Sequence, residues 1–123
     1  MRYKLLNNGI QIPMLGYGTL NISPSIAEKC VLDALKLGYR LIDTAAVYGN
    51  EIEIGQAVKK SNIPREELFI TTKVWVQDAG YENTLKAFET SLKNLGLDYI
   101  DLYLIHHPYG DYYGSLRAIE ELY

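Results

Sequence analysis

Hydrophobic and polar positions change their spacing along the chain in a way that predicts alternating helices and strands. Apolar residues recur at helical spacing in four segments, and short runs rich in β-branched or apolar residues lie between them. The predicted helices cover residues 24–37, 50–60, 82–95 and a segment from 115, and the predicted strands cover 13–18, 39–44, 69–74 and 99–105. This regular alternation is typical of right-handed crossovers in a parallel sheet.

The segment Tyr3–Pro13 has a different pattern, with two short strand-like runs around Asn8-Gly9. That dipeptide suits the positive φ angles of a type I′ turn, so the sequence predicts a β-hairpin ahead of the alternating elements. The next predicted boundary has Ser23 as a helix cap and Gly38 as the stop of the same helix.

The later elements carry further local signals. Asn50 and Glu53 have the spacing of a capping box, which predicts the start of the second helix. The predicted strand 99–105 is nearly continuously apolar, which suits a parallel strand covered on both faces. The last predicted helix has four residues on its apolar side: Leu116, Ile119, Leu122 and Tyr123.

Parallel strands with crossover helices can form an open doubly wound sheet or a barrel. The open sheet loses support because Asn21 stands where the dinucleotide-binding fingerprint needs its third glycine. An eight-stranded barrel typically needs about 250 residues. We therefore expect residues 1–123 to form one α/β domain, the N-terminal part of an incomplete (β/α)8 TIM barrel. It would contain the hairpin and roughly the first four β/α units.

Composition is that of a globular domain, with 48% hydrophobic and 22% charged residues. The formal net charge of -3 offers no electrostatic footprint for nucleic acid or an anionic membrane. No signal-peptide pattern and no apolar run of membrane-spanning length is present, so we expect a cytoplasmic protein. The single Cys30 lies on the apolar stripe of a predicted helix, where we expect a buried, inert thiol.

Three polar side chains lie at the carboxyl ends of successive predicted strands, Asp43, Lys73 and His106. Side chains alternate across a strand, so all three can point into a barrel, and barrel enzymes place their sites at that rim. Tyr48 follows Asp43 closely enough to reach the same mouth. Each residue also has a purely structural explanation. Asp43 and Lys73 would form an ion pair, Tyr48 would pack as an aromatic, and His106 would be a hydrogen-bonded structural residue. Their joint placement nevertheless favours a functional site.

These residue types suit the reduction of a carbonyl group. A phenol ordinarily has a pKa of about 10, so at neutral pH Tyr48 can donate a proton to an oxygen that is gaining charge. Lys73 would stabilise the phenolate, Asp43 would hold Lys73, and His106 would orient and polarise the carbonyl. The hydride has to come from a cofactor, because no side chain supplies one.

Two other chemistries use some of the same residues. His106 and His107 are adjacent, and adjacent strand residues point to opposite faces, so we expect no metal site there. Lys73 would be a Schiff-base lysine if the chain were a barrel aldolase. Pairing with Asp43 argues against that role, because it keeps the amine protonated.

With these residues identified, four long stretches resemble the aldo-keto reductase family, specifically bacterial members that reduce small aldehydes, keto-sugars and diketo acids. The stretches are residues 13–19, 40–51, 69–75 and 92–106. The resemblance implies a (β/α)8 barrel whose bottom is closed by the hairpin, with NADPH bound so that the nicotinamide lies in the mouth. It also implies that the four polar residues form the family's catalytic tetrad, with Tyr48 as general acid. Gly18, Thr19 and Asp43 match positions that lie against the nicotinamide-ribose end.

Leu20 and His107 stand where many members of the family have tryptophan. We expect these two residues to line the substrate pocket together with Val47 and Trp75, although ordinary loop packing explains the loop residues as well. The family's strands five to eight, which carry further cofactor contacts, lie outside these 123 residues. Two hypotheses follow: reduction of small aldehydes or ketones once the barrel is complete, or an inactive half-barrel that self-associates or binds a partner through its open sheet.

Overall fold

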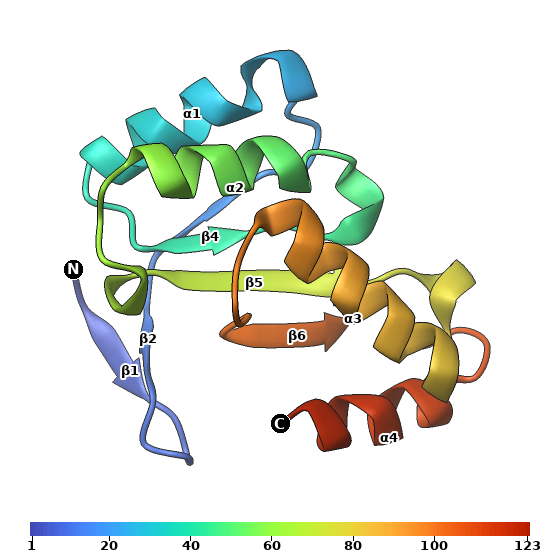
Figure 1. The fold of residues 1–123 in the computed structure, drawn as a ribbon. Coiled ribbons are helices and arrows are strands. Elements are labelled where there is room, and N and C mark those ends of the chain that lie inside the picture. Colours follow the sequence, from blue (N-terminus) through green and yellow to red (C-terminus); the bar gives the residue numbers. More distant parts are fainter.

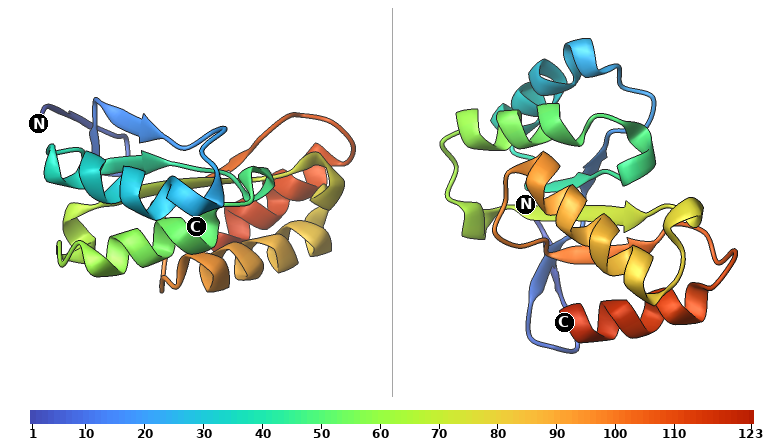
Figure 2. Two further views of the ribbon diagram at one scale, coloured as in Figure 1. Left: turned by 90° about the horizontal axis from the view of Figure 1, so that it is seen from above. Right: turned by 45° about the vertical axis from the view of Figure 1, so that its right-hand side comes forward.

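The chain folds as a four-stranded parallel sheet with its long helices on one face, seen in a computed structural model that describes all 123 residues (Figures 1 and 2). The strands are β1 (Tyr3–Leu5), β2 (Gln11–Pro13), β3 (Gly16–Gly18), β4 (Leu41–Asp43), β5 (Phe69–Val74) and β6 (Leu102–Ile105). The helices are α1 (Pro24–Lys36), α2 (Glu51–Lys60), α3 (Tyr81–Leu95) and α4 (Tyr112–Leu122), with short 3₁₀ turns η1 (Ala46–Tyr48), η2 (Arg65–Glu67) and η3 (Val76–Asp78). The sheet order β3-β4-β5-β6 follows the chain, which confirms the predicted alternation. None of the helices combines the length and apolar character needed to cross a bilayer.

The predicted hairpin is confirmed, because β1 and β2 pair in antiparallel register, but its turn differs from the prediction. Leu6 N donates to Ile10 O at 2.8 Å, which leaves a loop of three residues. Gly9 alone adopts a positive φ, 85°, and the Asn8 side chain accepts a hydrogen bond from Ile10 N. The type I′ turn is therefore wrong, because that turn has two central residues and both need positive φ.

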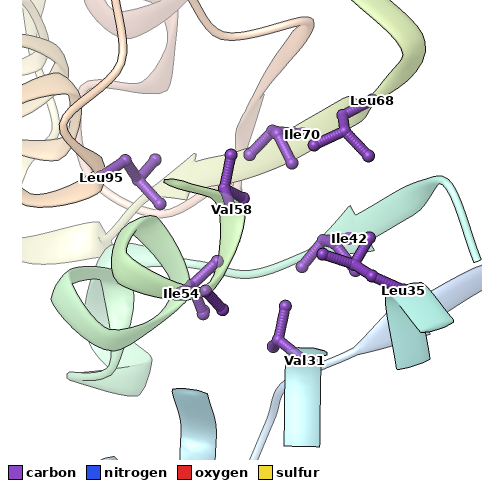
Figure 3. Packing of buried hydrophobic residues seen from close by; sticks show 9 residues of the cluster. Val31, Leu35, Ile42, Ile54, Val58, Leu68, Ile70 and Leu95 are labelled. Atoms are coloured by element: carbon purple, nitrogen blue, oxygen red, sulfur yellow. The ribbon is translucent and has the colours of Figure 1, made fainter. Parts of the chain in front are cut away.

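The hydrophobic core lies between the sheet and helices α1, α2 and α3 (Figure 3). Its nine buried members are Val31, Leu35, Ile42, Ile54, Ala57, Val58, Leu68, Ile70 and Leu95. Ile42 of β4 and Ile70 of β5 point into this core. Since side chains alternate along a strand, Asp43 and Lys73 fall on the opposite face, away from the helices. The core therefore decides which face carries the polar residues.

Helices α2 and α3 approach most closely at Gly55. A β-carbon built on Gly55 would lie 2.6 Å from the carbonyl carbon of Leu95, a backbone atom that cannot rotate away. Gly55 is buried in the middle of α2. Its lack of a side chain therefore allows the two helices to pack backbone to backbone.

The start of α1 departs from the predicted capping, although the helix itself is confirmed. Ser23 stands at the N-cap position without a side-chain cap, because its hydroxyl pairs with that of Ser25 at 3.0 Å. Gly38, with a φ of 98°, follows the helix end as predicted. Cys30 is only half-buried, not enclosed as expected, because it lies at the margin of the helix face that packs on the sheet.

Strand β6 is shorter than predicted and lies at the sheet edge. Residues 99–101 do not join the strand, because the Asp101 carboxylate accepts a hydrogen bond from Ile70 N at 2.8 Å and pairs with Arg65 at 2.6 Å. The expectation that both faces of this strand are covered is wrong, since Leu104 of β6 is 37% exposed. The apolar run alone cannot distinguish an edge strand from a central one.

Helix α4 begins earlier than predicted, because the Asp111 side chain accepts a hydrogen bond from Gly114 N at 2.8 Å and caps it. The predicted apolar side is partly wrong, since Leu116 and Tyr123 are 45% and 89% exposed. Small residues form the buried side instead: Gly114, Ser115 and Ala118. Ser115 bonds the Thr84 hydroxyl of α3 at 2.8 Å, so polar contacts help to dock this helix.

Candidate active site

Four polar side chains meet at the carboxyl ends of the parallel strands. Asp43 is the last residue of β4, Lys73 the next to last of β5, and His106 directly follows β6. Tyr48 ends η1, the short turn that leaves β4. The structure thus brings together all four residues that the sequence predicts for the catalytic set.

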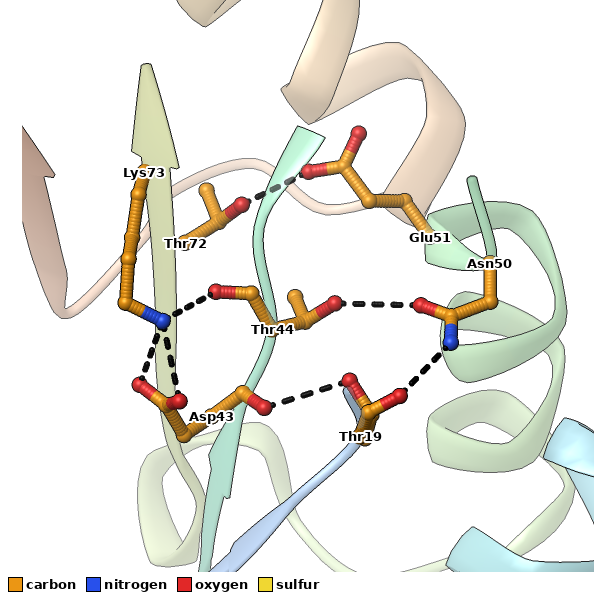
Figure 4. Close-up of polar contacts among 7 residues, drawn as sticks. All are labelled: Thr19, Asp43, Thr44, Asn50, Glu51, Thr72 and Lys73. Carbon is orange, nitrogen blue, oxygen red and sulfur yellow. Dashed lines mark hydrogen bonds and ion pairs between the residues drawn. The ribbon is translucent and has the colours of Figure 1, made fainter. Parts of the chain in front are cut away.

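The Lys73 ammonium group is held by three acceptors (Figure 4). Nζ lies 3.0 and 2.9 Å from the two carboxylate oxygens of Asp43 and 2.8 Å from the carbonyl oxygen of Thr44. The Lys73 side chain is 14% exposed and that of Asp43 is 38% exposed. An ammonium group has three N–H donors, so this cation is fully paired and its position is fixed.

The Tyr48 ring lies close to both the Lys73 ammonium group and the His106 imidazole. Lys73 Nζ is 5.3 Å from the ring centroid of Tyr48, within the range of a cation–π contact. The Tyr48 and His106 rings meet edge to face, with centroids 5.6 Å apart. A phenol, a paired ammonium group and an imidazole therefore lie close together at one site.

The electrostatic surroundings of His106 favour its neutral form. Burial lowers the pKa of this imidazole, and the positive charges of Lys73 and His107 lower it further, against a smaller opposing effect of Asp43. Its Nδ1 is buried without a hydrogen-bond partner in the protein. At neutral pH the ring can therefore donate from only one nitrogen.

We expect the NMR titration midpoint of His106 to lie below the ordinary value of about 6.5 and to rise when Lys73 is replaced by methionine. Replacing the exposed Lys59 on α2 is the matched control and should leave the midpoint unchanged. Because the unfolded chain binds this proton more tightly, the contribution of His106 to stability is present above pH ~6.5 and is lost as pH falls through the lowered pKa. A midpoint at or above the ordinary value in the unmodified chain would contradict the lowered pKa of His106.

A hollow of about 380 Å³ opens beside these residues. Its lining consists of Leu20, Asn21, Val47, Tyr48, Trp75, His106 and His107. All four residues predicted for the substrate pocket are in this set. Asn21 was missed, and its rim position is set by the turn after β3, which the sequence pattern does not specify.

His107 lies on the same side as His106, contrary to the expected opposite orientation. The two ring centroids are 4.8 Å apart, and Trp75 packs edge to face against both rings. Strand alternation fails here because β6 ends at Ile105. No group of three histidine, cysteine or acidic residues in the structure is placed to hold a metal ion.

The two predicted cofactor contacts before α1 differ in exposure. Gly18 lies beside Asp43 in the sheet register, and a β-carbon there would meet nothing within 4 Å. Thr19 is fully buried, and its N and Oγ1 both donate to the backbone oxygen of Asp43, at 3.0 and 3.2 Å. Gly18 thus leaves open backbone beside the Asp43 carboxylate, whereas Thr19 fixes the strand that carries it.

The predicted capping box at the start of α2 is wrong. Asn50 makes no side-chain cap. Its amide instead bonds the carbonyl oxygens of Thr19 and Ile22, as well as the Thr44 hydroxyl. The next residue, Glu51, is also buried and accepts a hydrogen bond from Thr72 at 2.7 Å. Asn50 and Glu51 therefore connect the start of α2 to segments at the carboxyl ends of the strands. The sequence spacing had instead favoured a capping contact of Asn50 within α2.

Comparison with known proteins decides the family. The profile of the aldo/keto reductase family matches residues 14–123. The chain belongs to the aldo-keto reductase family. It is 52% identical over 120 residues to the glyoxal reductase of Bacillus subtilis (strain 168), a match that covers 96% of this chain and 44% of the relative.

Solved structures of aldo-keto reductases have the same fold. An aldo-keto reductase enzyme from a Medee basin deep-sea metagenome library is 56% identical with a TM-score of 0.95, covering 98% of this chain and 45% of that one. A Bombyx mori aldo-keto reductase in complex with NADP is 36% identical with a TM-score of 0.92, covering 98% and 46%. The fold is therefore that of the N-terminal part of a (β/α)8 barrel with a hairpin, and the chain spans less than half the length of these relatives.

Proposed function

We propose that this aldo-keto reductase chain, in a complete barrel, reduces small aldehydes or ketones to alcohols with NADPH, and that Tyr48 is the general acid. The observation that carries the proposal is the fully paired Lys73–Asp43 unit beside the Tyr48 ring, with His106 facing the same ring. The hollow next to them has room for a small substrate. The name of the glyoxal reductase relative supports a small carbonyl compound as substrate.

Each residue has a separate task in this mechanism. The Tyr48 hydroxyl donates a proton to the carbonyl oxygen as negative charge develops there. Lys73 stabilises the phenolate that remains, and its three acceptors keep the charge in place. The neutral imidazole of His106 donates one hydrogen bond that orients the carbonyl.

The residues present fit the nicotinamide end of the cofactor. Gly18 leaves its backbone open, and the partly exposed Asp43 carboxylate can accept a hydrogen bond from a ribose hydroxyl. When bound, the cofactor supplies the hydride that no side chain can provide. The choice of NADPH over NADH follows the NADP-bound Bombyx mori relative.

The aldolase alternative is disfavoured by the surroundings of Lys73. A Schiff base forms from a free amine, whereas the three acceptors around Nζ match the three donors of an ammonium group. We therefore expect borohydride to trap no substrate on Lys73.

The direct test is a chimera that joins residues 1–123 to the remaining segment of the Bacillus subtilis glyoxal reductase. We expect saturable NADPH oxidation with glyoxal and other small aldehydes, and the 123-residue chain is assayed beside it. A folded chimera that binds NADPH but reduces no small carbonyl compound would refute the proposal. Equal activity of the unjoined chain would refute the need for a complete barrel.

A further inference from the structure

Asn50 makes three side-chain hydrogen bonds near the site, yet the proposed mechanism gives it no task. It is 0% exposed. Its Nδ2 donates to the carbonyl oxygens of Thr19 at 2.9 Å and Ile22 at 3.0 Å, and its Oδ1 accepts from the Thr44 hydroxyl at 3.2 Å. Both donors and the acceptor of the amide are therefore used, each on a segment outside α2.

The two carbonyl groups that Asn50 binds bracket the tip of one turn. Ile22 N donates to Thr19 O at 3.2 Å, so residues 19–22 form a closed turn. At its tip, Asn21 adopts a left-handed φ of 60°, which residues other than glycine rarely do, and Leu20 is 59% exposed. Both tip residues line the hollow. Asn50 thus clamps the base of the turn that forms one wall of the hollow.

The same amide reaches the catalytic pair through Thr44 and Thr19 (Figure 4). The Thr44 hydroxyl bonds Asn50, while the Thr44 carbonyl oxygen accepts from Lys73 Nζ at 2.8 Å. On the other side, Thr19 donates twice to the backbone oxygen of Asp43. The buried amide of Asn50 is therefore connected to each member of the ion pair through a single intervening residue, Thr44 for Lys73 and Thr19 for Asp43.

We propose that Asn50 is a positioning residue that holds the Leu20–Asn21 wall of the hollow and steadies the Asp43–Lys73 pair. Asparagine suits this task because a short amide offers two donors and one acceptor in a plane. Aspartate has the same shape but no donors, so it would remove the side-chain hydrogen bond from both carbonyl groups and bury a charge. The geometric part of this proposal stands without the reductase activity, and only its kinetic part rests on the proposed function.

The first test compares Asn50→Ala with Thr72→Val in the 123-residue chain. Thr72 is the matched control because it is equally buried and also bonds α2, through Glu51, but does not touch the turn. We expect amide hydrogen exchange in residues 17–24 to rise about tenfold or more in Asn50→Ala, since two carbonyl groups lose buried partners. Thr72→Val should lower the melting temperature and leave exchange in these residues unchanged.

Trp75 gives a second, optical measurement. It is the single tryptophan of the chain and lines the hollow together with Leu20 and Asn21. Quenching of its fluorescence by acrylamide should increase in Asn50→Ala and in Asn50→Asp, which keeps the acceptor but loses the donors. Wild-type exchange and quenching in both variants, or the same changes in Thr72→Val, would overturn the proposal. If Asn50→Ala fails to fold, Asn50→Ser, which keeps one donor, replaces it.

Kinetics in the chimera test the link to substrate. We expect Asn50→Ser to raise KM for the carbonyl substrate several-fold more than KM for NADPH, because the displaced wall lines the hollow. Equal increases in both constants would remove the specificity role. An inactive chimera would refute the proposed function, whereas exchange and Trp75 quenching would still decide the role of Asn50.

Discussion

Replacing Tyr48 with phenylalanine is expected to lower kcat of the complete enzyme by about 10²–10⁴-fold, the usual contribution of a positioned general acid. The substitution removes only the hydroxyl group. The ring keeps its contacts with Lys73, 5.3 Å from the centroid, and with His106, 5.6 Å between centroids. The dissociation constant for NADPH should therefore change little. Steady-state kinetics in the chimera and a fluorescence titration with NADPH measure the two quantities.

The matched control for this variant is Tyr109→Phe. Tyr109 lies near the same rim, with its ring 5.9 Å from that of His107, and is 67% exposed. Loss of its hydroxyl should leave turnover within about twofold of the unmodified enzyme, because no transition-state contact is removed. Unchanged turnover in Tyr48→Phe would contradict the acid role assigned to Tyr48.

The substitution Gly55→Ala is expected to lower the free energy of unfolding by about 3 kcal/mol or more, at the upper end for overpacking. The added methyl group would meet the backbone carbonyl of Leu95, so α2 and α3 have to separate. Total stability is about 5–15 kcal/mol for a typical domain, and this loss is a large part of it. Urea denaturation followed by circular dichroism measures the change.

Gly18→Ala is the matched glycine substitution for this stability test, because a β-carbon at Gly18 meets nothing within 4 Å. We expect its effect to stay within about 0.5 kcal/mol. Equal losses in the two variants would show that the close approach of α2 and α3 is not what makes Gly55 necessary.

Hydrophobic periodicity predicted the order of the elements, because the helices α1, α2 and α3 and the strands β4 and β5 each bury one face against the same core. The strand Phe69–Val74 has the predicted limits. The errors lie where a side chain binds a distant backbone group. Asp101 caps β5 and shortens β6, and Ser115 docks α4 on α3. A local sequence pattern cannot predict hydrogen-bond partners that are this distant along the chain.

The same distinction holds for the candidate site. Alternation along three strands placed Asp43, Lys73 and His106 on one rim, since that rule needs only the strand limits. The contacts of Asn50 were missed because its partners Thr19 and Ile22 are 31 and 28 residues away. Capping rules consider only neighbours in sequence, and they assigned this side chain to its own helix.

Strand register gives the Asp43–Lys73 pair an all-or-none character. Asp43 lies opposite Thr71 in the sheet, two residues before Lys73 and on the same face. A slip of β5 by a single residue would turn Lys73 toward the helices, so no intermediate alignment preserves a weaker version of the pair. Substitutions that disturb the pairing of β4 with β5 should therefore lower the fraction of catalytically active molecules. The turnover rate of each active molecule should stay unchanged.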